Sequence, residues 1–463
     1  MRPRTITLAV AAVLAAAAVV TGAVAVAGAD STTRLAAITA PELLAKMATS
    51  HGQTQAVSGE VSWTNGLFGD VADMAGDTFG GMPAQSPLFA GGSGRVWMSE
   101  DGVRLESQGG GGDQVLVVSG EGRDAWVYDY AADTTRHVIV TGADAGFGVT
   151  HMTPSPAASP ASLTPAGVGV MLQRLAPLGS LSVEGQAAIA GREAYVLAFT
   201  PAAADTALGA VKVAIDGQRY VPLRLQVFAR GGTEPVLQSG FDSVSFAAID
   251  AERFTFTPPP GANVTTETID AAELRRRAKA ETSGLEDQAR KALTEGELDR
   301  ALLSRSQAEQ LVPYELATAS ADARPFRRAF VLEDGMPLTA SGVPLLDLAV
   351  MGALASHDGQ AAGEKGGPVT VQVYGSGLGS IVLVQSPSEP QPSAAEQPAT
   401  PQSPGDLEGL TGVVEQMDVN GRQAAVVTTP LGGVVMWRQG GTTLVAAGMV
   451  PAADLRDFAR SVR

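Results

Sequence analysis

The segment 211–264 places apolar residues at every second position, and this pattern limits the fold more than any other feature of the chain. Its first run, 211–216, alternates valine and isoleucine with polar or small residues, as a β-strand with one wet face does. A turn at Asp216-Gly217 separates this run from a second one, 221–227. The pattern predicts antiparallel strands that share one broad apolar face. The residues that we expect on that face are Val213, Ile215, Leu223, Leu225 and Val227.

The end of this segment predicts curvature and then a stop. The apolar positions change parity between Phe241 and Val244, so we expect a β-bulge near Gly240, and a bulge bends its sheet. A last strand is predicted at 254–257. The prolines at 258–260 then end the pairing, because proline has no N–H to donate to a neighbouring strand. The segment as a whole predicts a curved antiparallel sheet.

The composition excludes several classes of protein. With 463 residues the chain can form two ordinary domains, and a formal net charge of -16 argues against nucleic-acid binding and against a polybasic membrane patch. The chain has no cysteine, which rules out disulfides, thiolate metal sites, thiol catalysis and a lipid-modified N-terminal cysteine. Its 54 glycines and 28 prolines suit turns and linkers better than a helical bundle.

Patterns typical of catalysis or metal binding are missing from the sequence. The four histidines, His51, His137, His151 and His357, are scattered and lack the spacing of metal ligands. A glycine-rich stretch, 375–379, follows a predicted strand but leads into another strand, so it lacks the helix N-terminus that binds phosphate. No Gly-x-Ser-x-Gly motif occurs. We therefore expect a protein that is not an enzyme and that has no cofactor and no metal.

The first 29 residues have the features of an export signal. Arg2 and Arg4 precede an uncharged run rich in alanine and valine, 5–29, whose last three residues match a small-residue cleavage site before Asp30. The run is also long enough to span a bilayer as an uncleaved anchor. Arginines before the run and none within it place the rest of the chain outside the cytoplasm in either case. We expect an extracytoplasmic, periplasm-like location, with 1–29 as a signal peptide or an N-terminal membrane anchor.

A helix and an apolar loop precede the main strands. Thr39-Ala40-Pro41-Glu42 has the spacing of a capping box, and the helix that it begins carries Leu43 and Met47 on one side. The loop 65–94 is rich in glycine yet contains many large apolar residues. It is either a surface loop that tucks a few side chains onto the core or a mobile apolar flap over a hydrophobic opening, a role that suits methionine and phenylalanine. The flap candidates are Leu67, Phe68, Phe79 and Met82.

Further strands are predicted on both sides of this loop. The first, near residue 60, puts Trp63 on the same side as two valines, and more strands follow between 95 and 130. Within the last of these, Trp126, Tyr128 and Tyr130 form an aromatic ladder, which serves either cross-strand packing or a ligand platform. The candidate cavity residues in these strands are Trp63, Val96, Met98, Leu105, Trp126 and Tyr128.

Several short strings in this region resemble the periplasmic lipoprotein carrier LolA and its relatives. Ser119-Gly120, Ala125-Trp126-Val127-Tyr128-Asp129 and 135–138 stand in the order of the family's SDG, LWLYD and QVT strings, and 254–259 resembles its closing FTPP segment. Arg104 falls on the arginine with which the carriers hold their helical lid, although Leu105 replaces the aromatic residue that normally follows it. The resemblance covers about 36–264. The chain is also similar to actinobacterial exported proteins of this type and to the sensor RseB.

The resemblance implies an incomplete, strongly bent β-barrel that is covered by helices and encloses an apolar cavity. The residue pattern agrees, because a curved sheet with one apolar face needs a helix layer or a ligand to cover it. The expected fold class for 30–264 is therefore α+β, a LolA-like curved antiparallel sheet covered by helices. An interior filled completely by side chains is the alternative, and it would make this domain a structural scaffold.

The composition changes after residue 264. Residues 265–302 are rich in alanine, glutamate, arginine and leucine with balanced charges, which predicts a helical connector. A second, smaller α/β domain is expected at 303–463, with a short helix at 304–311 and a terminal helix whose first turn contains Pro451. The Pro/Ser-rich stretch 386–405 is expected to form an extended loop. This half resembles a small uncharacterised domain of bacterial exported proteins.

These features predict an exported cell-envelope protein whose first domain binds a hydrophobic ligand, the acyl chain of a lipid or lipoprotein. A carrier or chaperone role is expected. The alternative is a sensor like RseB, in which the same cavity reads a lipid and the second domain contacts a membrane-bound signalling partner. No nucleic-acid partner is expected.

Overall fold

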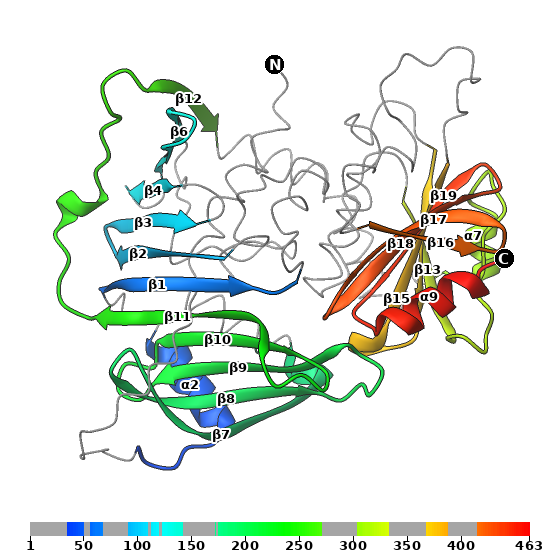
Figure 1. Cartoon of the computed structure of the whole chain (residues 1–463), viewed down its shortest axis with the longest axis horizontal. Coiled ribbons are helices and arrows are strands. Elements are labelled where there is room, and N and C mark those ends of the chain that lie inside the picture. The colour runs from blue at the N-terminus through cyan, green and yellow to red at the C-terminus, as the bar shows by residue number, and fades with distance from the viewer. Residues whose placement is uncertain are drawn as a thin grey trace, which may run out of the picture. The chain divides into compact units, whose positions relative to one another are not determined.

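The computed structural model describes two compact units of the chain (Figure 1). Unit 1 contains the described residues between 35 and 270 except 203–208, and unit 2 contains 203–208 together with the described residues from 303 onward. The residues that the structure describes are 35–50, 56–67, 91–109, 113–119, 123–141, 172, 175–270, 303–332, 367–387 and 414–463.

Unit 1 is built on a twelve-stranded sheet that does not close on itself. Its strands are β1 (Val57–Asn65), β2 (Gly92–Ser99), β3 (Gly102–Gly109), β4 (Gln114–Ser119), β5 (Asp124–Asp129), β6 (Thr134–Thr141), β7 (Gly179–Ile189), β8 (Arg192–Pro201), β9 (Leu208–Asp216), β10 (Pro222–Ala229), β11 (Pro235–Ser245) and β12 (Asn263–Asp270). They lie in the order β12-β6-β5-β4-β3-β2-β1-β11-β10-β9-β8-β7 (Figure 1). β12 pairs with β6 in parallel, whereas the consecutive pairs from β1 to β6 and from β7 to β9, and the pairs β1–β11 and β10–β11, are antiparallel. An open, strand-rich sheet of this kind agrees with the predicted incomplete barrel.

Irregular pairings bend the sheet at several places. Between Glu60 and Val61 of β1 the register on β11 shifts, which leaves Asp242 as an extra residue on β11. Further shifts occur in the β10–β11 and β7–β8 pairs. The bulge predicted near Gly240 is therefore confirmed close to its expected place, and the extra residue is the reason that the apolar parity of β11 changes.

The chain after β11 differs from the prediction. Residues 254–257 do not form a strand: Ala251–Phe254 is a short 3-10 helix, η6, which begins where the Asp250 carboxylate accepts the backbone N–H of Glu252 at 3.0 Å. The prolines do not end the pairing either, because β12 follows them and joins β6. Residues 265–270 therefore belong to a strand and not to a helical connector. A proline removes only its own N–H from a ladder, so strand-forming residues beyond it remain free to pair.

The helix α2 (Ala40–Ser50) packs on one end of the sheet (Figure 1). Its predicted capping box is present: the backbone N–H and the hydroxyl of Thr39 donate to the Glu42 carboxylate at 2.9 and 2.7 Å, and the Glu42 N–H donates to the Thr39 hydroxyl at 3.4 Å. Leu43 and Met47 are buried, as predicted, and pack on β8 and β9. A helical cover over the remainder of the sheet stays a prediction.

Both faces of the sheet carry apolar clusters. Because successive residues of a strand face opposite sides, Leu116 and Val118 of β4 belong to one cluster while Val115 and Val117 belong to another. Phe254 of η6 closes the second cluster. The first and larger cluster includes Val57, Val61, Val96, Leu105, Leu116, Val118, Ala125, Val138, Val140, Leu223 and Phe241.

Unit 2 contains a seven-stranded sheet. Its strands are β13 (Phe326–Leu332), β14 (Val369–Tyr374), β15 (Ile381–Pro387), β16 (Val414–Val419), β17 (Arg422–Thr429), β18 (Gly432–Gln439) and β19 (Thr442–Gly448). All six pairs in the order β13-β14-β15-β19-β18-β17-β16 are antiparallel, so the predicted α/β class is wrong for this unit and α+β describes it. The physical reason is the short turns, such as Asn420-Gly421, where both residues have positive φ (55° and 82°) and reverse the chain directly.

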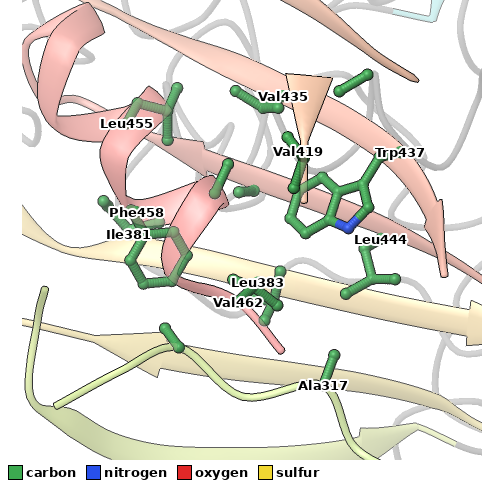
Figure 2. Packing of buried hydrophobic residues seen from close by; sticks show 14 of the residues in the cluster. Ala317, Ile381, Leu383, Val419, Val435, Trp437, Leu444, Leu455, Phe458 and Val462 are labelled. Atoms are coloured by element: carbon green, nitrogen blue, oxygen red, sulfur yellow. The ribbon is translucent and has the colours of Figure 1, made fainter. Parts of the chain in front are cut away.

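Helix α9 (Ala452–Ser461) packs across one face of this sheet (Figure 2). Leu455, Phe458, Ala459 and Val462 are buried there, as predicted, against Trp437 and its neighbours. The predicted helix at 304–311 is confirmed as α7 (Arg305–Glu309), which begins with a capping box between Ser304 and Gln307.

The helices in the described parts of the chain are all too short or too polar to cross a membrane. The predicted export segment 1–29, most of the connector and most of the loop 386–405 lie outside the described residues.

Candidate functional site

A line of side chains crosses four strands on one face of unit 1. Val96 of β2, Leu105 of β3, Leu116 of β4 and Val127 of β5 stand directly beside one another in the register. Paired residues of neighbouring strands point to the same face, so these four form a continuous apolar row. Arg136 of β6 is next in line, opposite Val127. We call the four apolar residues the apolar row.

A second line runs beside the apolar row, two residues away along each strand. Met98, Val118, Ala125 and Val138 face the same side, and Met98 is partly buried while the other three are buried. Together the two lines make a broad apolar surface, which we call the β2–β6 face. Among the described residues no helix lies over this face, since α2 packs on β8 and β9.

The structure brings several predicted cavity residues together here. Val96, Met98 and Leu105 lie on the β2–β6 face, and Leu223 of β10 belongs to the same apolar cluster. Trp63 pairs with Gly92 across β1 and β2, and its indole lies so close to this glycine that a Cβ at residue 92 would meet the ring at 2.5 Å. Gly92 is therefore needed to seat the indole.

Other predicted cavity residues lie elsewhere. Val213 and Ile215 are buried beneath α2, and Leu225 also packs partly against that cluster. Val227 is partly buried and pairs with Leu237 of β11. The residues that the alternation assigned to one face thus serve two clusters: Ala214, which lies between Val213 and Ile215 and faces the other side of β9, shares its cluster with Leu223.

The aromatic ladder faces away from the apolar row. Trp126 stacks on the imidazole of His137, with ring centroids 3.6 Å apart, and the imidazole Nε2 lies 2.5 Å from Asp124 Oδ1. The Tyr128 hydroxyl donates to Asp133 at 2.9 Å, and this hydrogen bond raises the pKa of the phenol. Trp126 pairs with His137 across β5 and β6, so this contact is cross-strand packing, one of the two interpretations of the ladder.

Arg104 anchors the η6 segment to β3. Its Nε donates to Glu106 at 2.8 Å, and its Nη1 donates to the backbone carbonyls of Arg253 and Thr255 at 3.4 and 3.3 Å. In the described part of the chain its contacts are with this segment and not with α2. Its role in a helical lid stays a prediction.

The apolar flap lies almost wholly outside the described residues. Phe68, Phe79 and Met82 are not described, and Leu67 is the last described residue before them. The Leu67 N–H donates to Asn65 Oδ1 at 2.9 Å, which turns the chain at the end of β1. The flap therefore stays a prediction.

Sequence reasoning missed most of the β2–β6 face. β4 reads Gln-Val-Leu-Val-Val-Ser, and a strand that is apolar on both faces shows no alternation from which one face can be identified. Arg136 looks like a residue of a wet face, and only the cross-strand register places it beside Val127. The unpredicted residues of the face are Leu116, Val118, Ala125, Val127, Val138 and Arg136.

Metal chemistry has no support in the described residues, where no group of three or more histidine, aspartate or glutamate side chains could hold a metal ion. The most enclosed ion pair among the described residues of unit 1 joins Arg192 to Asp216 at the end of β9. It lies among structural hydrogen bonds to Gln218 and Arg219, which tighten the turn into β10.

No family model and no curated protein matches this chain. It is similar to several solved structures. MucB in complex with MucA(peri) is 14% identical over 92% of this chain and 98% of that one, with a TM-score of 0.37. The Pseudomonas aeruginosa MucA/MucB complex is 15% identical over 91% and 97%, also with a TM-score of 0.37. A LolA superfamily protein, NE2245 from Nitrosomonas europaea, is 11% identical over 48% of this chain and 99% of that one, with a TM-score of 0.18.

The solved structures to which the chain is similar thus include MucB and a LolA superfamily protein. These identities are below 25% and these TM-scores are below 0.5, so the matches establish nothing about what the chain binds. Its function has to be argued from its own residues.

Proposed function

We propose that unit 1 binds a hydrophobic ligand, the acyl chain of a lipid or lipoprotein, and acts as a carrier or chaperone in the cell envelope. The β2–β6 face is the observation that carries the proposal: two apolar lines cross it, and among the described residues no helix lies over it. Burial of apolar area contributes about 25 cal/mol per Å², so an alkyl chain can bind such a surface without directional contacts. The protein would then be a binding protein and not an enzyme.

A lipid sensor of the RseB kind is the second candidate. Unit 2 favours it, because a second folded unit with its own core is more than a simple carrier needs. In this role the β2–β6 face binds the lipid that is sensed, and unit 2 contacts a membrane-bound envelope partner. A carrier hands its ligand to acceptor vesicles, whereas a sensor keeps the ligand and changes its affinity for the partner, so a transfer assay separates the two.

A filled interior is the outcome against which the ligand proposal has to be tested, because Val96, Leu105 and Leu116 are shielded from solvent. Met98→Trp adds bulk at a partly buried position of the face. A tightly packed core loses about 1–3 kcal/mol of stability when it is overfilled, whereas a ligand site accepts the indole at the ligand's expense. We expect the variant to fold and to lose binding of dansylaminoundecanoic acid, measured by fluorescence titration.

Val264→Trp is the matched control. Val264 is 44% exposed on β12 and pairs with Thr135, whose neighbour Arg136 faces the other side of the sheet. The control adds the same indole away from the β2–β6 face, so it should bind the probe as the wild type does. A wild type that binds no probe, together with a Met98→Trp variant that unfolds, would identify unit 1 as a packed scaffold.

A further inference from the structure

Arg136 is a cation at the end of an apolar line. It pairs with Val127 in the register of β5 and β6, so its side chain leaves the sheet on the same face as Leu116 and Val127. The next residue, His137, faces the other side, where it stacks on Trp126. Arg136 is half-buried at this position.

The guanidinium of Arg136 makes no hydrogen bond and no ion pair with any residue that the structure describes. Other arginines of unit 1 have such partners: Arg95 and Arg104 bind Glu106, and Arg192 binds Asp216. A guanidinium presents five N–H donors, and none of those of Arg136 is among the buried polar atoms without a partner, so they reach solvent and any acceptor that binds from it.

Two carboxylates lie on the same face near Arg136, and neither pairs with it. Glu267 of β12 is two residues beyond Thr265, the β12 residue in register with Arg136, and no ion pair joins the two side chains. Asp129 of β5 accepts hydrogen bonds from Gln114 Nε2 at 3.1 Å and from the Ala132 backbone N–H at 2.9 Å. Among the described residues the donors of Arg136 thus have no acceptor, and they are open to one that a ligand brings.

We propose that Arg136 binds the oxyanion of the ligand's head group, a carboxylate or a phosphate, while the acyl chain lies across β2–β5 along the apolar row. This inference rests on the proposed function. Val96 and Arg136 are separated by four interstrand steps, about 19 Å at roughly 4.8 Å per step, which is the length of a long acyl chain. A planar guanidinium binds carboxylate and phosphate oxygens in pairs, and an apolar surround strengthens such bonds.

The test compares an acid with its ester. Wild type, Arg136→Gln, Arg136→Lys and the control Arg95→Gln are titrated with dansylaminoundecanoic acid and with its methyl ester, and folding is checked by circular dichroism. Arg95 is on the opposite face and carries the same charge, so its variant reports the effect of net charge alone. We expect Arg136→Gln to weaken binding of the acid about tenfold or more and to leave the ester unchanged. Arg136→Lys should restore part of the affinity.

The outcomes separate the two proposals. If Arg136→Gln binds acid and ester as the wild type does, or if Arg95→Gln weakens the acid equally, the head-group site is wrong while the hydrophobic site stands. If the wild type binds neither acid nor ester, the proposed function itself fails. Displacement of the acid by sodium phosphate would show a site for free anions and overturn the lipid head group; no displacement supports it.

Discussion

Asp216 shows how one buried carboxylate ties two strands together. It has no exposed surface, and it accepts hydrogen bonds from the Arg192 guanidinium, from the backbone N–H of Gln218 at 3.0 Å and from that of Arg219 at 2.5 Å. Burial alone would raise the pKa of Asp216, but the bonds from Arg192 and the two N–H groups outweigh it and hold the pKa below its ordinary value. The charged form is therefore the one that stabilises the fold.

The lowered pKa of Asp216 predicts how the stability of unit 1 changes at low pH. Because the folded pKa of Asp216 lies below the unfolded value of about 3.9, its stabilisation is fully present above the unfolded pKa and is lost as pH falls through the folded one. Asp216→Asn should lower the free energy of unfolding by about 1–3 kcal/mol at pH 7, and by less at pH 3. Urea unfolding at both pH values measures this. Glu100→Gln, in an exposed turn, is the control, and an equal loss at both pH values would contradict the argument.

At the residue scale, contacts between residues that are close in the sequence could be predicted, whereas the register between strands could not. The capping box at Thr39 and the buried face of α2 follow from residue types a few positions apart. Arg136 does not, because its place beside Val127 depends on how β5 and β6 align. A single arginine in a strand is typical of a wet face, and only the pairing shows that it ends an apolar row.

At the scale of elements, β12 is held differently from the other strands. It pairs with β6 through eight aligned residues, yet Ile269 is the one apolar side chain of β12 that packs against a core, and Val264 is 44% exposed. Parallel pairing is also slightly less stable per residue than antiparallel pairing. Few buried contacts on a backbone ladder favour local opening.

We therefore expect the amides of β12 to exchange with solvent faster than those of β5, which has partners on both sides and lies between two apolar clusters. Hydrogen exchange followed by NMR or mass spectrometry, under conditions that keep unit 1 folded, measures the difference. Equal protection of the two strands would mean that β12 unfolds only together with the rest of the sheet.

The prediction for the elements on either side of the prolines 258–260 was wrong for a physical reason. Residues 254–257 alternate Phe and Thr as a strand does, but Phe254 and Phe256 both pack on the cluster beneath η6. Residues 263–270 are rich in threonine, valine and isoleucine, which favour strands, and this local preference is the better guide to β12. Alternation indicates which residues share a face only after the element has been identified.

At the scale of the whole molecule, the open sheet and the terminal helix could be predicted, whereas the class of unit 2 could not. Alternating apolar residues and Asn420-Gly421 predict strands and a turn, but they do not say whether later strands return beside earlier ones. β19 inserts between β15 and β18, a long-range pairing that no local pattern contains. That insertion brings Leu444 beside Trp437 and builds the core that α9 covers (Figure 2).

The core of unit 2 leads to the last prediction, that residues 303–463 fold by themselves. Its main cluster, from Ala317 to Val462, lies within this stretch, and Trp437 is 1% exposed at its centre. Trp437 is also the only tryptophan after residue 303, so the fluorescence of the fragment reports its surroundings alone. We expect the folded fragment to show blue-shifted Trp437 emission. The emission should shift to longer wavelength in a single cooperative unfolding transition as urea is added. Phe458→Ala, which removes about 3–5 kcal/mol of packing beneath α9, should shift that step to lower urea or abolish it. Red-shifted emission from the unmutated fragment would show that unit 2 needs the rest of the chain to fold.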